Sequence, residues 1–169
     1  RSELRTTGAK VTTYATDLAD FAALDALAAQ VTEVHGGVDV LIHNAAHSIR
    51  RGIADSRARF HDYERTMQLN YFAPVRLTLG LLPTLRERHG SVCHVLTMGV
   101  LIPGPYFSAY LSSKAALEAF GNCLAAEFHH EGVQVSNIYL PLVRTEMMAP
   151  TKAYAERKDI MTPERAAHM

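Results

Sequence analysis

Residues 38–46 read VDVLIHNAA, and this stretch decides the fold class. Its apolar residues are nearly continuous, and they follow Gly36, which ends a helical pattern. A strand inside a parallel sheet is covered on both faces and therefore carries such a continuous apolar run. We therefore expect residues 38–46 to form a strand of a parallel sheet that is buried on both faces.

Strand and helix patterns alternate on both sides of this stretch. The predicted strands are 11–18, 38–46, 91–97 and 133–140. The predicted helices are 21–36, 60–88 and 109–132, with the end of an earlier helix at 1–8 and the start of a last one at 163. Strands that alternate with helices form βαβ units. The sequence therefore predicts an α/β fold with a doubly wound parallel sheet of the Rossmann-like kind.

Capping residues mark the ends of these helices. Asp20, Ser108 and Thr162 are predicted N-caps, because their side-chain oxygens can accept a hydrogen bond from the first helical turn. Gly36 and Gly132 are predicted to end helices, because glycine readily adopts the left-handed backbone found there. These boundaries are predicted from local chemistry alone.

Composition argues against several classes of protein. The 169 residues carry 17 basic and 17 acidic side chains, so neither nucleic acid nor a charged membrane surface is indicated as a partner. The sequence has no apolar run of transmembrane length, and its first residues do not read as a signal peptide. Cys93 and Cys123 do not make a disulfide framework. We therefore expect one cytoplasmic domain over residues 1–169.

The residues that follow the predicted strands are the candidates for a binding site. They are Asp17, Asn44 to Ala46, Thr97 to Gly99 and Pro141 to Thr145. Ligands of open parallel sheets bind beyond the carboxyl ends of the strands. We therefore expect the side chains of these residues to meet at one edge of the sheet.

Tyr110 and Lys114 are the pair of residues that indicates chemistry. They are four positions apart at the start of a predicted helix and therefore share one face. A nearby cation lowers the pKa of a phenol from its usual value of about 10, which makes the phenol a usable acid near neutral pH. The Thr97 hydroxyl ends a strand and could hold a carbonyl oxygen against that phenol. The alternative is a solvated lysine beside a packed tyrosine, because this spacing often occurs by chance.

These residues and two further motifs resemble the short-chain dehydrogenase/reductase family. The motifs are HNAA at 43–46 and MQLNYF at 67–72. The resemblance covers essentially the whole chain and implies an oxidoreductase that uses NADP(H) or NAD(H). The implied catalytic residues are Asn70, Thr97, Tyr110 and Lys114. The implied cofactor-binding residues are Asp17, Leu18, Asn44, Ala45, Ala46, Tyr110, Lys114, Val143 and Thr145.

The chain departs from the family pattern at three places. Thr97 stands where the family usually has serine, and its extra methyl group narrows the choice of rotamers. His43 and Ala46 replace the first asparagine and the glycine of the family's Asn-Asn-Ala-Gly turn. Leu142 replaces the glycine of the Pro-Gly pair that usually follows the last of these strands.

Four longer stretches resemble bacterial fatty acyl-CoA reductases within this family. They are HSIRRGI (47–53), RFHDYERTMQLNYF (59–72), FSAYLSSKAALEAF (107–120) and YLPLVRTEMMAPTKAY (139–154). The resemblance implies that a long acyl thioester is reduced to an aldehyde with NADPH. Met147, Met148, Pro150 and Tyr154 suit an alkyl chain, since methionine fills irregular apolar gaps. The alternatives are a ketoreductase or alcohol dehydrogenase for another small substrate, and a non-catalytic subunit of the same fold.

The family's Gly-rich turn is not found in this sequence. In the family, that turn follows the first strand and holds the cofactor pyrophosphate at a helix N-terminus. We therefore expect residues 1–169 to be one domain that is incomplete at both ends, lacking its N-terminal Gly-rich strand-turn-helix and its C-terminal strand. The family also implies a small apolar carbonyl substrate and a homodimer or homotetramer formed through helices 60–88 and 109–131.

Pro74 lies four residues after Asn70 in a predicted helix. A proline has no N–H for the carbonyl of Asn70, and its ring pushes against that carbonyl. The helix is therefore predicted to kink and to leave this carbonyl free to hold an ordered water. In the family, a proton relay passes through a water held at this asparagine. The alternative is that Pro74 only bends the helix around the core.

Two other groups of residues are weaker candidates. His43 and His47 are four positions apart without an evident carboxylate or thiol partner, which disfavours a metal site. Arg50 and Arg51 could meet a phosphate of coenzyme A, but a solvated loop is the simpler interpretation.

Overall fold

Three parallel strands form the sheet of this computed structural model, which describes residues 8–148, 151, 154, 157 and 159–168. The strands are β1 (Val40–His43), β2 (Ser91–Thr97) and β3 (Gln134–Leu140), in the order β1-β2-β3. His94 of β2 is in register with His43 of β1 and with Asn137 of β3. The predicted parallel α/β sheet is confirmed for these strands.

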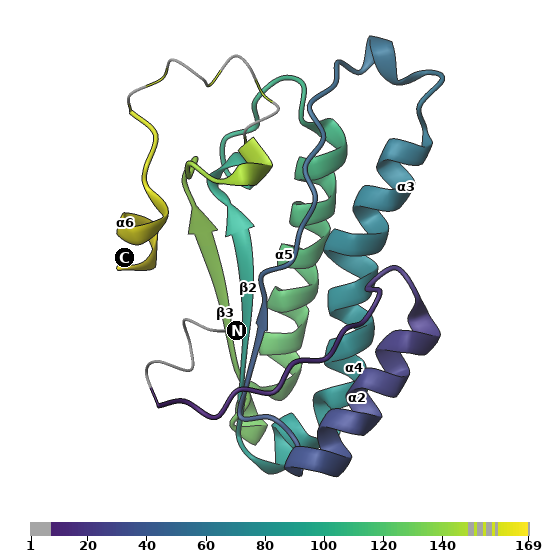
Figure 1. Cartoon of the computed structure of the whole chain (residues 1–169), viewed down its shortest axis with the longest axis vertical. Helices are drawn as coiled ribbons and strands as arrows, with labels where there is room; N and C mark the ends of the chain where they lie inside the picture. Colours follow the sequence, from purple (N-terminus) through teal and green to yellow (C-terminus); the bar gives the residue numbers. More distant parts are fainter. Residues whose placement is uncertain (1–7, 149–150, 152–153, 155–156, 158, 169) are drawn as a thin grey trace.

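The long helices lie side by side along one face of the sheet (Figure 1). The long helices are α2 (Phe21–His35), α4 (Ala73–Glu87) and α5 (Ser108–Phe128). Two shorter helices are α3 (His61–Met67) and α6 (Pro163–Ala167). Short 3-10 turns are η1 (Ala54–Ser56), η3 (Met98–Val100), η4 (His129–Glu131) and η5 (Glu146–Met148). α4 contacts α2 and β1, whereas α5 contacts β2 and β3. None of the helices described here is long and apolar enough to cross a membrane.

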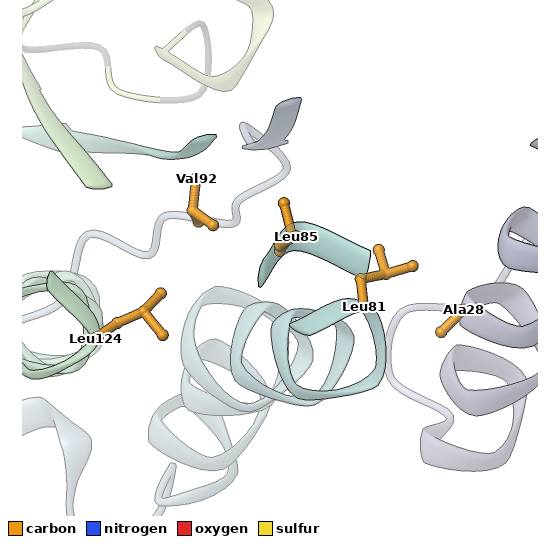
Figure 2. Close-up of a cluster of buried hydrophobic side chains, with 5 residues drawn as sticks. All are labelled: Ala28, Leu81, Leu85, Val92 and Leu124. Atoms are coloured by element: carbon orange, nitrogen blue, oxygen red, sulfur yellow. The ribbon is translucent and has the colours of Figure 1, made fainter. Parts of the chain in front are cut away.

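The apolar core lies between α2, α4, α5 and β2 (Figure 2). Its buried members are Ala28, Leu81, Leu85, Val92 and Leu124. Alternate residues of β2 are buried, beginning with Val92, because successive side chains of a strand point to opposite faces. Burial of one leucine side chain contributes about 1.5–3 kcal/mol. The core therefore holds the helical layer against the strand that ends at the candidate site.

Local capping follows the sequence at several helix ends. The Asp20 side chain accepts hydrogen bonds from the first turn of α2, and the Thr162 hydroxyl accepts one from the first turn of α6. Gly36 and Gly132 have left-handed backbones, with φ of 71° and 85°. These four predictions are confirmed because a cap satisfies backbone groups only a few residues away.

The predicted N-cap at Ser108 is wrong. Ser108 is the first residue of α5, and Phe107 holds the N-cap position without a side-chain hydrogen bond. The Ser108 hydroxyl instead pairs with the hydroxyl of Tyr63 on α3 at 2.7 Å. The Ser108 side chain therefore forms a tertiary hydrogen bond instead of capping the helix.

The strand predicted at residues 11–18 is also wrong. These residues pair with none of the described strands. β-Branched residues favour an extended backbone, but a strand exists only where a neighbour takes its ladder hydrogen bonds. The side-chain contact of this segment is with α2, since the Tyr14 hydroxyl pairs with Nε2 of His35 at 2.8 Å. The helix end predicted at residues 1–7 lies outside the described residues.

The strand predicted at residues 38–46 is shorter than expected and is not buried on both faces. Only Val40 to His43 are paired, and Val40 and Ile42 are 58% and 60% exposed. The helices that pack on the sheet cover the other face, so alternate residues of β1 have no described cover. The apolar run therefore predicted a strand correctly, but the prediction that both of its faces are buried is wrong.

The helix predicted at residues 60–88 is continuous but contains a π-helical turn, η2 (Gln68–Phe72), between α3 and α4. The N–H of Ala73 donates to the carbonyl of Gln68, five residues earlier. Pro74 follows directly and has no N–H to donate. The predicted disturbance at Pro74 thus takes the form of a π turn, a feature frequent at functional sites. The role predicted for the Asn70 carbonyl stays a prediction.

Candidate active site

A pocket of about 580 Å³ lies at the carboxyl ends of the three strands. From the strand ends, its lining includes Asn44, Ala46, Thr97, Gly99, Val143 and Thr145. Tyr110 and Lys114 reach it from the first turns of α5. Parallel strands bring their carboxyl ends to the same edge, which explains why residues as far apart in the sequence as Asn44 and Thr145 meet here. Most of the predicted site residues are thus gathered in one place.

Four predicted site residues are not part of this lining. They are Asp17, Leu18, Ala45 and Asn70. The Asp17 carboxylate lies on an exposed turn before α2 and accepts a hydrogen bond from the N–H of Ala19 at 2.9 Å. The cofactor contacts of Asp17, Leu18 and Ala45 and the catalytic role of Asn70 therefore stay predictions.

Tyr110 is largely buried, and its pKa is raised because burial disfavours the phenolate. A hydrogen bond with the Thr97 hydroxyl lowers that pKa to a smaller extent. The Thr97 oxygen also accepts a hydrogen bond from the N–H of Gly99 at 3.2 Å, which fixes the side chain at the end of β2. The Thr97 hydroxyl therefore lies close enough to the phenol to affect its pKa, and both groups line the pocket.

Lys114 is 2% exposed, and burial lowers its pKa to about 8. Its Nζ donates to the backbone carbonyl of Val95 in β2 at 2.7 Å. The expected lowering of the Tyr110 pKa by Lys114 is not found in this arrangement, since burial of the phenol dominates and the ammonium group is turned to Val95. The sequence predicts that the two residues share one helix face, but their electrostatics depend on burial.

Asn70 holds the loop after β1 against α5. Its side-chain amide accepts from the N–H of His47 and donates to the carbonyl of the same residue, both at 2.8 Å. The amide nitrogen also donates to the hydroxyl of Ser113 at 2.9 Å, one residue before Lys114. Asn70 is fully buried within η2, so it is a fixed support behind the pocket.

A row of polar side chains crosses the buried face of the sheet beneath Lys114. Its members, in order, are Thr78, His43, His94, Asn137 and Asn122. His43 and His94 are both buried, and burial lowers the pKa of each. Sequence reasoning missed His94 and Asn137, and the available signal was a polar residue inside an otherwise apolar strand.

The segment after β3 supplies an apolar wall of the pocket. Met147, Met148 and Tyr154 line it as predicted, and Pro150 lies outside the described residues. The ring of Tyr154 is stacked with that of Phe107, with centroids 6.4 Å apart and planes inclined by 5°. This pair joins the segment to the loop before α5. No cluster of three or more His, Cys, Asp or Glu side chains in the described part of the chain is arranged to hold a metal ion.

Comparisons with known proteins agree with this geometry. The profile described as "short chain dehydrogenase" matches residues 1–156. A fatty acyl-CoA reductase of Acinetobacter baylyi is 46% identical over 163 residues, which are 96% of this chain and 55% of that protein. A fatty acyl-CoA reductase of Mycobacterium tuberculosis is 48% identical over 155 residues, which are 90% of this chain and 53% of that protein. The chain thus spans about half the length of these curated relatives.

A solved structure shares the arrangement of strands and helices. It is a metagenomic short-chain oxidoreductase in complex with NADP, which matches with a TM-score of 0.75 and 25% identity. The match covers 80% of this chain and 62% of that one. The parallel sheet, the residues gathered at its carboxyl edge and the family profile all lead to one assignment. The chain belongs to the short-chain dehydrogenase family, a class of NAD(P)-dependent oxidoreductases.

Proposed function

We propose that the protein carrying this chain is an NAD(P)(H)-dependent oxidoreductase that transfers a hydride to or from a carbonyl carbon. The observation that carries the proposal is the meeting of Thr97, Tyr110 and Lys114 in one largely apolar pocket. An apolar pocket with a few convergent polar groups is the usual form of a small-molecule site. The intact set of polar groups also favours catalysis over a non-catalytic use of the fold.

Tyr110 is the proton donor when a carbonyl is reduced. The Thr97 hydroxyl donates to the substrate oxygen and holds it beside the phenol. A nicotinamide cofactor, when bound, supplies the hydride for the carbonyl carbon. Tyr110 gives its proton to the oxygen. Lys114 stabilises the phenolate that remains, for which its ammonium group has to turn from the Val95 carbonyl toward the phenol. Asn70 supports this group from behind, through the loop after β1 and through α5.

The cofactor is NADP(H) or NAD(H), with its nicotinamide end in this pocket. Lys114 and Tyr110 contact the ribose, and Val143 and Thr145 hold the carboxamide. These four residues line one pocket together with Asn44 and Ala46, which supports the proposal. The remaining cofactor contacts are proposed for Asp17, Leu18 and Ala45.

The substrate is a long acyl thioester or the fatty aldehyde derived from it. The apolar side chains of the pocket support this choice of substrate, and they include Ile102, Leu111 and Met148. Two relatives that are 46% and 48% identical bear the name fatty acyl-CoA reductase. Hydride addition to a thioester carbonyl gives a hemithioacetal, and its collapse releases the thiol and the aldehyde.

The test follows NADPH oxidation by the full-length protein. We expect faster turnover with dodecanoyl-CoA or dodecanal than with a short polar ketone, and turnover at least about a hundredfold slower with each of these substrates in Tyr110→Phe. A preference for the short ketone would favour the ketoreductase alternative. Full activity of the Tyr110→Phe variant would refute the proposed chemistry.

The quaternary structure proposed is a homodimer or homotetramer formed through residues 60–88 and 109–131. Exposed small residues along α5 support it, because they allow a second helix to approach closely. They are Ser112, Ala115, Ala119, Asn122 and Ala126. Light scattering after size exclusion should give a dimer or tetramer mass, and Ala119→Arg should shift the population to monomer.

A further inference from the structure

The rim of the pocket carries a stacked arginine. Arg50 follows β1 by seven residues, is exposed, and belongs to the pocket lining together with Tyr106. Its guanidinium carbon lies 4.3 Å from the centre of the Tyr106 ring. Stacking holds the plane of the guanidinium group while its N–H edges stay available for an acceptor. Among the described residues, Arg50 has no carboxylate within ion-pair distance.

The backbone conformation and a backbone hydrogen bond fix the position of Tyr106. Tyr106 has φ of 73°, in the left-handed region that residues other than glycine rarely adopt. The N–H of Arg51 donates to the Tyr106 carbonyl at 2.7 Å and joins the two loops. A strained residue persists only where its surroundings hold it, and such residues gather at ligand sites. The loops are therefore arranged to keep the Tyr106 ring beneath Arg50.

The surrounding loop has an excess of positive charge. Residues 50–65 contain five arginines and three carboxylates, whereas the whole chain is neutral. One carboxylate, Asp62, is 2% exposed and is contacted by Arg51, Arg59 and Arg65 at 2.9, 3.6 and 2.8 Å. With Asp55 and Glu64 included, the arginines of this loop still outnumber its carboxylates, which leaves a net positive charge around Arg50. This side of the pocket mouth thus favours an anion.

An anion here would belong to a ligand whose other part is apolar. The pocket interior that Arg50 borders is lined by side chains such as Ile102, Phe107 and Met147. An acyl thioester of coenzyme A combines these features, since an alkyl chain and a phosphate-bearing carrier flank one reactive carbonyl. A guanidinium group is well suited to phosphate, because it donates two parallel hydrogen bonds.

We propose that Arg50, held by Tyr106, binds a phosphate of the coenzyme A carrier at the mouth of the pocket. The proposal rests on the proposed acyl thioester function and adds the residue that recognises the carrier. It replaces the simpler interpretation of this loop as merely solvated. The arginine acts on binding of the carrier and leaves the reacting carbonyl to Thr97 and Tyr110.

The experiment compares substrates with and without the phosphates in the full-length protein. The substrates are dodecanoyl-CoA, the N-acetylcysteamine thioester of the same acid, and dodecanal. Arg50→Gln should raise KM for dodecanoyl-CoA about tenfold or more, because a hydrogen bond to a charged group is lost. The values of KM for the other two substrates and for NADPH should not change. Arg57→Gln is the matched control, since Arg57 is exposed on the same loop and does not line the pocket.

Binding of free coenzyme A, measured by titration calorimetry, separates this inference from the proposed function. Arg50→Gln should weaken binding of coenzyme A about tenfold and leave pantetheine, which has no phosphate, unaffected. If wild-type protein binds coenzyme A through Arg50 but reduces no thioester, the anion site stands and the proposed substrate is wrong. If thioesters are reduced and Arg50→Gln changes KM equally for both of them, or for neither, the anion site is wrong.

Discussion

His43 and His94 stack against each other across β1 and β2, with ring centroids 5.5 Å apart and planes inclined by 16°. Nε2 of His43 pairs with the Thr78 hydroxyl at 2.8 Å, and Nδ1 of His94 pairs with Oδ1 of Asn137 at 3.0 Å. Burial lowers the pKa of both rings, that of His43 to about 3, and the nearby Lys114 cation adds to the effect. Both imidazoles are therefore neutral when the protein is folded at neutral pH.

Stability is expected to fall as the pH drops below about 6.5. An unfolded histidine takes up a proton near that pH, whereas folded His43 does so only near its pKa of about 3. The free energy of unfolding is therefore highest above pH 6.5. It falls between pH 6.5 and 3 by up to about 1.4 kcal/mol per pH unit for each such histidine. Urea unfolding at pH 7.5, 6.5 and 5.5 measures this change in the free energy of unfolding. His43→Asn should have a shallower dependence on pH, and equal slopes for the two proteins would contradict this account.

Gly121→Ala should destabilise the fold by about 1–3 kcal/mol, the usual cost of overpacking a core. A Cβ at this position of α5 would lie 2.7 Å from Nδ1 of His94 and 2.8 Å from Oδ1 of Asn137. The control is Gly104→Ala, because a Cβ at Gly104 meets no atom within 4 Å. Urea unfolding of the two variants should differ by this amount. Equal stabilities would mean that α5 can shift away from the sheet freely.

Tyr110→Phe should reduce turnover by about a hundredfold to ten-thousandfold, the typical contribution of a positioned proton donor. The phenyl ring keeps the packing, so cofactor affinity should stay nearly unchanged. Lys114→Ala should weaken both turnover and cofactor binding, because Lys114 is proposed to serve the phenol and the ribose. Stopped-flow kinetics and cofactor titration measure the two effects. Substantial residual turnover by Tyr110→Phe would assign the proton to another group.

Thr97→Val should lower kcat about a hundredfold to a thousandfold, the usual cost of one oxyanion donor. Valine keeps the shape of the side chain and removes only the hydroxyl that accepts from the N–H of Gly99 and lowers the pKa of Tyr110. Thr97→Ser keeps the hydroxyl and should stay active. The comparison uses steady-state rates at saturating cofactor. If Thr97→Val is as active as Thr97→Ser, the oxygen of the substrate is held elsewhere.

Pro74→Ala should slow turnover without destabilising the protein. Alanine supplies an N–H that can bond to the carbonyl of Asn70 and compete with the proposed relay water. The control is Pro83→Ala, since Pro83 is exposed inside α4 and does not line the pocket. The measurements are kcat and the solvent isotope effect on it. If kcat is unchanged in Pro74→Ala, the role of Pro74 is limited to bending the helix.

The sequence was sufficient to bring two residues of the candidate site together. Tyr110 and Lys114 were predictable because a helix places residues four apart on one face, whatever surrounds it. Their pKa values were not predictable, since they depend on burial by segments far away in the chain. For the same reason, the stack of His43 on His94 could not be derived from two strands whose pairing was unknown.

Features that need only near neighbours along the chain follow from the amino-acid sequence. Asp20 caps α2 and Gly36 ends it, because each satisfies backbone groups within four residues. Tertiary structure alone decided the features that need a partner from elsewhere. Residues 11–18 have the composition of a strand but pair with none of the strands in the described part of the chain, and Ser108 bonds Tyr63 instead of capping α5. The physical reason is that ladder hydrogen bonds, burial and pKa shifts are properties of two or more segments in contact, and no single segment contains them.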